Sequence, residues 1–385
     1  MDVRGEDCRA QARRARRRGL PLEHFSLSPA VGLGPDEGLP PMVDYDRLVP
    51  YGWTEAVASE YLPVLAEGLS PARIVRMDRS ECDVVTAHGP TRAACPRDIT
   101  GLCTGDWVGI DAERTVRQLL PRRSVIMRSS VSGRSVAQVL ATNVDTVLIC
   151  TAADGDVDLG RIERMLALAW ESNAQPVVVL TKADAAVDIP LDEVRAIAPG
   201  ATVLAVSAAA DVGLDVLRAV LTGTVALLGP SGAGKSTLAN ALLGADVFAT
   251  NAVRAVDGKG RHTTVHRELR PLPGGGTLID TPGLRGIGLY DAAEGIGKTF
   301  SDIESLAADC RFDDCAHETE PGCAVLAALA DGTLPDRRLA SYRKLAKENE
   351  WMAARTDKRL AAERAQVWKT IRKEQRRQYR ERGRR

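Results

Sequence analysis

One nine-residue segment constrains the fold of this 385-residue chain more than any other. Residues 229–237 read GPSGAGKST and fit the pattern G-x-x-x-x-G-K-S/T. An apolar run, TVALL, precedes them and a helical run, LANALLG, follows, so the sequence predicts a strand, a glycine-rich turn and a helix in succession. The backbone N–H groups of such a turn and the helix N-terminus bind phosphate. The alternative, a chance glycine-rich turn, does not explain this placement.

The residue types in this segment predict how a nucleotide would be held. We expect Lys235 to reach the β- and γ-phosphates, the Ser236 hydroxyl to bind Mg²⁺ and Thr237 to add a phosphate contact. The candidate nucleotide-binding residues here are Gly229, Pro230, Ser231, Gly232, Ala233, Gly234, Lys235, Ser236 and Thr237.

The surrounding sequence alternates between strand-like and helical patterns. Apolar strand-like runs occupy residues 144–152, 176–181, 202–208, 224–229 and 277–280, and amphipathic segments such as 161–173 lie between most of them. This alternation predicts an α/β domain with a doubly wound parallel sheet.

Two further motifs indicate that the nucleotide is GTP. Thr181-Lys182-Ala183-Asp184 follows a strand-like run and resembles the N/T-K-x-D motif of GTPases, with Thr181 in place of the commoner Asn. In that motif the carboxylate, here Asp184, accepts two N–H groups of guanine, and the stem of Lys182 packs on the base. Adenine lacks this donor pair. Ser207 and Ala208 end another strand-like run and resemble the loop that contacts the guanine carbonyl through backbone N–H groups.

Two segments resemble the switch regions of GTPases. Asp280-Thr-Pro-Gly283 matches D-x-x-G, in which Asp280 would hold Mg²⁺ through water and the Gly283 N–H would meet the γ-phosphate. Residues 258–264, GKGRHTT, resemble switch I, in which Thr263 or Thr264 would supply a second hydroxyl to Mg²⁺.

The residue that activates water is less evident. Leu284 stands where many small GTPases place a water-orienting Gln, and an apolar side chain cannot orient water. We expect His262 to replace it, because a neutral imidazole can orient the attacking water or accept its proton. A structural or solvent-facing histidine is the alternative.

The motifs occur in an unusual order. Asp184 and Ser207 precede Gly229, whereas ordinary GTPases begin with the phosphate-binding loop and end with the base-reading motif. The sequence therefore predicts a circular permutation, which such domains tolerate when their ends lie at the surface.

The cysteines indicate a metal site. Cys310, Cys315, His317 and Cys323 lie within 14 residues and offer three thiolates and one imidazole. This is a complete tetrahedral set for one structural Zn²⁺, with no open position. We expect Cys150, in an apolar strand, to be a core residue.

Charge and composition divide the chain further. Residues 337–385 contain 18 basic and 6 acidic side chains, although the whole chain is neutral. Such a basic tail favours an anionic partner such as a phosphate backbone, and a solvated helical face is the alternative. We expect residues 1–65 to be a flexible extension, 66–128 an OB-type β-barrel, 129–290 the permuted GTPase domain and 291–385 a helical zinc-binding domain. With neither a secretory signal nor an 18-residue apolar run, we expect a cytoplasmic protein.

Together these motifs resemble one family, the circularly permuted GTPases that depend on the small ribosomal subunit (RsgA, or YjeQ). The similarity covers roughly residues 65–345, and Val265, where a third Thr is common, departs from the pattern. The resemblance implies a monomeric GTPase that binds the 30S subunit and its rRNA late in assembly without a membrane. It also implies subunit-stimulated hydrolysis of GTP to GDP, with His262 at the position of the proposed catalytic histidine.

Two other classes of protein remain possible from the residues alone. A different P-loop enzyme, an ATPase or kinase, would bind ATP and GTP equally, and Asp184 argues against it. A non-catalytic RNA-binding module would carry a relic nucleotide site, and the intact Lys235, Ser236 and Asp280 argue against that.

Overall fold

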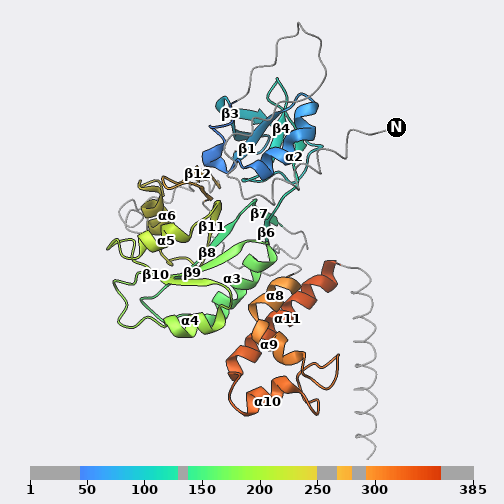
Figure 1. The fold of residues 1–385 in the computed structure, drawn as a ribbon, viewed down its shortest axis with the longest axis vertical. Helices are drawn as coiled ribbons and strands as arrows, with labels where there is room; N and C mark the ends of the chain where they lie inside the picture. The colour runs from blue at the N-terminus through green and yellow to red at the C-terminus, as the bar shows by residue number, and fades with distance from the viewer. Residues whose placement is uncertain (1–43, 129–137, 249–266, 280–291, 357–385) are drawn as a thin grey trace, which may run out of the picture. The chain divides into compact units, whose positions relative to one another are not determined.

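The computed structural model describes residues 44–128, 138–248, 267–279 and 292–356 (Figure 1). Within these ranges no helix is long and apolar enough to cross a membrane. The described residues contain a five-stranded, a six-stranded and a two-stranded sheet.

The first sheet is antiparallel and curls until its edges meet. Its strands are β1 (Ser70–Met77), β2 (Glu81–Thr86), β3 (Gly89–Ala94), β4 (Trp107–Ile110) and β5 (Val116–Leu119), in the order β3-β2-β1-β4-β5. A parallel bridge joins Ala94 to Thr115, and the Ala94 N–H donates to the Arg114 carbonyl at 2.8 Å. The two edge strands therefore meet, and inward side chains such as Ile74, Val84 and Val108 form a core.

The segment before this sheet differs from our expectation. Residues 49–66, part of the predicted flexible extension, form a short 3-10 helix (Val49–Tyr51) and helix α2 (Glu55–Ala66). Trp53 and Tyr61 pack against Trp107 of β4, and the Tyr61 hydroxyl donates to the Val108 carbonyl at 2.6 Å. These aromatic side chains fix the segment to the sheet, although the Pro- and Gly-rich sequence before it suggested a flexible arm. Residues 1–43 lie outside the described part of the chain.

The second sheet contains the phosphate-loop strand. It consists of β10 (Thr202–Ala205), β9 (Gln175–Thr181), β8 (Thr146–Ala152), β11 (Thr224–Leu228), β13 (Thr277–Ile279) and β12 (Leu269–Pro271), in that order. The five predicted strands are parallel, and the unpredicted β12 pairs antiparallel with β13. A short antiparallel pair, β6 (Val125–Arg128) and β7 (Gln138–Thr142), precedes this sheet in the chain.

Helices cover both faces of this sheet. They are α3 (Leu159–Glu171), α4 (Leu191–Ile197), α5 (Leu214–Val220) and α6 (Lys235–Leu243). Val147 and Ile149 of β8 join the apolar cluster that contains α3 and α4, whereas Leu148 and Cys150 join the cluster that contains α5 and α6. The sheet is doubly wound, as the alternating sequence predicted.

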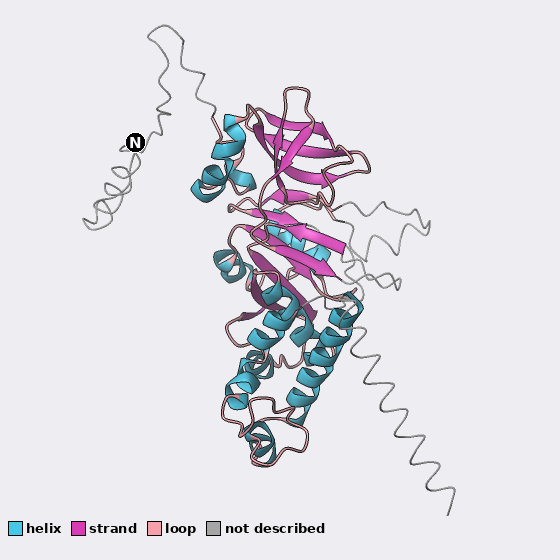
Figure 2. Ribbon diagram, turned by 90° about the vertical axis from the view of Figure 1, so that its right-hand side faces the viewer, coloured by secondary structure: helices cyan, strands magenta, loops and turns pink. Residues whose placement is uncertain are grey.

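After β13, the described residues form helices joined by loops (Figure 2). They are α8 (Ala293–Thr299), α9 (Ser301–Ala307), α10 (Ala324–Ala330) and α11 (Asp336–Thr356). Helix α8 packs so closely on α3 that a Cβ at Gly295 would lie 2.0 Å from the Ala167 carbonyl oxygen.

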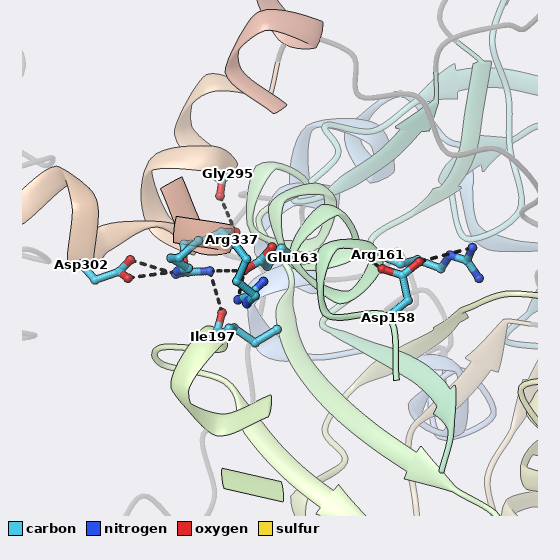
Figure 3. A network of polar contacts seen from close by, with 9 residues as sticks. Asp158, Arg161, Glu163, Ile197, Gly295, Asp302 and Arg337 are labelled. Atoms are coloured by element: carbon cyan, nitrogen blue, oxygen red, sulfur yellow. Dashed lines mark hydrogen bonds and ion pairs between the residues drawn. The ribbon is translucent and has the colours of Figure 1, made fainter. Parts of the chain in front are cut away.

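A buried ion-pair network joins the same helices (Figure 3). Glu163 of α3 is fully buried, and its Oε1 lies 2.7 Å from Arg338 Nη1 and 2.8 Å from Arg337 Nη2. Arg338 also contacts Asp302 of α9 at 2.8 Å and donates to the Thr299 carbonyl at 2.7 Å. The C-terminal helices are thus attached to the α/β sheet through α3.

Candidate nucleotide-binding site and cysteine cluster

The glycine-rich segment forms the predicted turn between a strand and a helix. Strand β11 is buried along its length and ends at Leu228, and α6 begins at Lys235. Gly229 has φ 148°, and a Cβ there would lie 2.2 Å from the Cys150 carbonyl oxygen. Gly234, at the N-cap of α6, has φ 70°. The loop therefore requires glycine for its backbone geometry and for its close approach to β8.

The Lys235 ammonium lies across this loop. Its Nζ donates to the carbonyls of Gly229 and Pro230 at 2.8 and 2.6 Å. Cys150 lies behind it in β8 with no exposed surface, as predicted for a core residue. Burial raises the pKa of the Cys150 thiol to about 12, although the charge of Lys235 opposes the shift. The thiol therefore stays neutral at physiological pH.

The base-reading motif contacts the phosphate loop directly. Thr181, only 4% exposed, places its Oγ1 2.9 Å from the Ala233 carbonyl and 3.3 Å from the Thr151 carbonyl. A hydroxyl can donate only one hydrogen bond. The shorter of the two distances indicates that Thr181 donates to the Ala233 carbonyl of the phosphate loop. Thr181, a predicted GTP-binding residue, thus contacts the phosphate loop through its side chain.

The two residues that should meet the base follow Thr181. Lys182 has φ 58°, unusual outside glycine, and its Nζ lies 2.8 Å from Asp154 Oδ2. The hydrogen bond from Lys182 lowers the pKa of Asp154. Asp184 lies exposed two residues further on.

The Ser207 loop lies beside this motif. The Ala183 N–H donates to the Val206 carbonyl at 3.1 Å, which joins the two loops. Ser207 is fully buried, and its Oγ accepts the Ala210 N–H at 3.0 Å. The Ser207 side chain therefore shapes the loop that also contains Ala208, whose base contact stays a prediction.

All these segments follow parallel strands at their carboxyl ends, the edge at which doubly wound sheets bind ligands. The structure brings together the phosphate loop, residues 181–184 and residues 207–208. The predicted switch residues, His262, Thr263, Thr264, Asp280 and Gly283, lie outside the described residues.

The cysteine cluster forms a compact set of ligand atoms. One ligand atom from each of Cys310, Cys315, His317 and Cys323 lies within 4.8 Å of the others. Cys310 Sγ lies 3.8 Å from Cys323 Sγ and 3.6 Å from His317 Nδ1, and His317 Nδ1 lies 3.4 Å from Cys323 Sγ. A tetrahedral Zn²⁺ with Zn–S near 2.3 Å and Zn–N near 2.0 Å implies S–S edges of about 3.8 Å and S–N edges of about 3.5 Å. The cluster fits this ion.

Neighbouring groups hold the cluster in place. Cys323 is the N-cap of α10, and its Sγ accepts the Leu326 N–H. Arg343 of α11 donates to the His317 carbonyl. The Glu320 carboxylate accepts the N–H groups of Ala316, Glu318 and Thr319 at 2.8–3.0 Å. The hydrogen bond with its own backbone N–H, together with these three, lowers the pKa of Glu320 to about 2. No sequence pattern signalled these supporting contacts.

Comparison with known proteins identifies the family. The model of the RsgA GTPase family matches residues 119–290. The "Small ribosomal subunit biogenesis GTPase RsgA" of Streptomyces avermitilis is 56% identical over 336 residues, covering 84% of this chain and 91% of that protein. This chain belongs to the RsgA GTPase family. The RsgA of Opitutus terrae is 44% identical over 359 residues, 86% of this chain and 98% of its own length.

Solved structures support the permuted fold of this member of the RsgA GTPase family. YjeQ from Thermotoga maritima aligns with a TM-score of 0.54 at 22% identity, covering 72% of this chain and 98% of that chain. YloQ, described as a circularly permuted GTPase, aligns with a TM-score of 0.52 at 22% identity and covers 73% and 94%. The circular permutation predicted from motif order is confirmed.

Proposed function

We propose that this protein is a GTPase of small ribosomal subunit biogenesis that hydrolyses GTP to GDP and phosphate. The carrying observation is its 56% identity, over most of both chains, with a protein of that name. The described phosphate loop and base-reading motif support this function, because they meet at one edge of the sheet.

The proposed contacts follow the chemistry of each group. Lys235 and the loop N–H groups hold the phosphates, Thr237 adds a phosphate contact, and Asp184 reads guanine. Ser236 binds the Mg²⁺ that accompanies GTP. Mg²⁺ neutralises charge on the β- and γ-phosphates when bound.

The remaining roles belong to residues outside the described ranges. We assign Thr264 and Asp280 to Mg²⁺, and Thr263 and the Gly283 N–H to the γ-phosphate. His262 orients or deprotonates the attacking water.

The cysteine cluster is proposed to hold one structural Zn²⁺. Its four ligand atoms lie within 4.8 Å of one another and would fill all four positions of a tetrahedral ion, so no position would be left for a substrate. The ion would stabilise the loop between α9 and α10.

The partner is proposed to be the small ribosomal subunit and its rRNA. The strand order β3-β2-β1-β4-β5 with a bridge between β3 and β5 supports an OB-type barrel, a fold that binds oligonucleotides. The basic residues of 337–385 favour a phosphate backbone. We propose a cytoplasmic monomer with an N-terminal extension, this barrel, the GTPase domain and a helical zinc-binding domain, divided near residues 65, 128 and 290.

The test is nucleotide hydrolysis by the purified full chain, with and without small ribosomal subunits, with ATP in parallel. We expect subunits to stimulate GTP turnover and ATP to be hydrolysed poorly. Asp184→Asn should reduce the preference for GTP over ITP. Equal turnover of ATP and GTP would instead support a general P-loop ATPase, and GTP turnover that subunits leave unchanged would contradict the proposed partner.

A further inference from the structure

Asp154 lies beside the base-reading motif, and no sequence motif includes it. It follows β8, and the pairing with β9 continues past the end of the strand, because the Ala153 N–H donates to the Thr181 carbonyl at 2.8 Å. This hydrogen bond fixes the backbone next to Asp154 against the start of the motif. The Asp154 carboxylate thereby lies 2.8 Å from the ammonium of Lys182.

The backbone of Lys182 is equally well defined. Its φ is 58°, and the peptide group that follows it is held at both ends, since the Ala183 N–H donates to the Val206 carbonyl and the Ala185 N–H donates to the Lys182 carbonyl at 3.0 Å. The side chain is a flexible four-carbon stem, which loses rotamer entropy when it is ordered. In the described structure, Asp154 is the carboxylate that holds its charged end.

We propose that Asp154 is a positioning residue for guanine recognition, which holds the Lys182 ammonium so that the stem lies ready to pack on the base. The inference rests on the proposed GTPase function. Asp154 acts through Lys182 and does not itself touch the nucleotide.

A second ion pair, between Asp192 and Arg195, provides a comparison with the Asp154–Lys182 pair. Asp192 and Arg195 lie 3.0 Å apart within one helix, and the Asp192 side chain is 98% exposed. The Asp154–Lys182 pair instead joins the ends of two neighbouring strands, with side chains only 35% and 39% exposed. The hydrogen bond from Lys182 keeps the pKa of Asp154 low, so the carboxylate is charged at neutral pH.

The test is a double-mutant cycle on nucleotide affinity. GDP binding to the full-length protein is measured for wild type, Asp154→Asn, Lys182→Ala and the double variant, with Asp192→Asn as the matched control. Asp154→Asn should weaken GDP binding by up to about fivefold, the range of a partly exposed ion pair, through faster dissociation. In the Lys182→Ala background the same substitution should have no effect. Asp192→Asn should bind as wild type does.

Two further readouts separate positioning from base reading. The preference for GDP over IDP should stay unchanged in Asp154→Asn, because Asp184 is intact. The difference between wild type and Asp154→Asn should shrink in 1 M salt, where the Debye length is about 3 Å.

Several results would overturn the inference and leave the GTPase function standing. The first is a GDP affinity of Asp154→Asn equal to that of wild type, and the second is an equal loss of GDP affinity in Asp192→Asn. The third is a loss of GDP affinity on Asp154→Asn that persists in the Lys182→Ala background, which would show direct contact between Asp154 and the nucleotide. A wild-type protein that binds no GDP and hydrolyses no GTP would instead refute the function.

Discussion

The buried Glu163–Arg338 pair permits a quantitative prediction about how the C-terminal helices are attached. Arg338→Met keeps an apolar stem over the Phe300 ring, which lies 4.3 Å from the guanidinium, but removes every charged contact. Breaking a buried pair typically costs about 3–5 kcal/mol, because a charge is left uncompensated. Here Arg337 still contacts Glu163, and the Asp302 side chain is 42% exposed to water. We therefore expect the lower end, about 3 kcal/mol of unfolding free energy.

Urea unfolding followed by tryptophan fluorescence tests this value, since Trp170 lies in α3. Arg164→Gln is the matched control, because its pair with Glu348 joins the same helices but is 21% and 27% exposed, and should cost about 1 kcal/mol or less. Replacing both Glu163 and Arg338 with Met should recover most of the lost stability, because a protein with a buried ion pair is rarely more stable than one with apolar side chains in its place. A single variant within 1 kcal/mol of wild type, or a double variant less stable than the single, would refute this reasoning.

Three further substitutions test the site. Gly229→Ala should abolish GDP binding measured by calorimetry, because its Cβ would lie 2.2 Å from a strand carbonyl, whereas Gly297→Ala, which meets no atom within 4 Å, should bind normally. We expect elemental analysis to find about one metal ion per wild-type chain and Cys315→Ser to lose it; full metal content in that variant, or metal loss in the control Cys95→Ser, would contradict the zinc assignment. Thr181→Val removes the hydroxyl that contacts the phosphate loop, so GTP and GDP should both bind about fivefold more weakly; Thr181→Ser should restore affinity, and unchanged binding by the Val variant would refute the role.

The sequence predicted those parts of the fold that local patterns encode. Five parallel strands, all but β10 largely buried, read as apolar runs, and the phosphate loop has an unambiguous glycine pattern between strand and helix. The edge strand β12 has only three residues, one of them Pro271, so no alternation could reveal it. Helix α2 escaped notice because its packing depends on contacts with Trp107, distant in sequence.

Contacts between residues that are distant in the sequence account for the parts of the site and of the fold that could not be predicted. Lys182 and Asp154 are 28 positions apart, and Arg338 and Glu163 are 175 apart. A charged side chain in an amphipathic helix usually faces solvent, so nothing in the sequence of α3 distinguished the buried Glu163 from its exposed neighbours. Only the packing of α11 against α3 defines its partner.

The permuted chain order leaves the site intact because sheet pairing, not chain connectivity, brings its parts together. Strand β8 lies between β9, which carries the base-reading motif, and β11, which carries the phosphate loop. The carboxyl end of β8 contacts both segments, because the Thr151 carbonyl lies near Thr181 and the Cys150 carbonyl lies beside Gly229. The register of β8 with both neighbours therefore fixes the distance between the predicted base and phosphate subsites. Any connection that preserves this register, including one that places the base-reading half first, yields the same site.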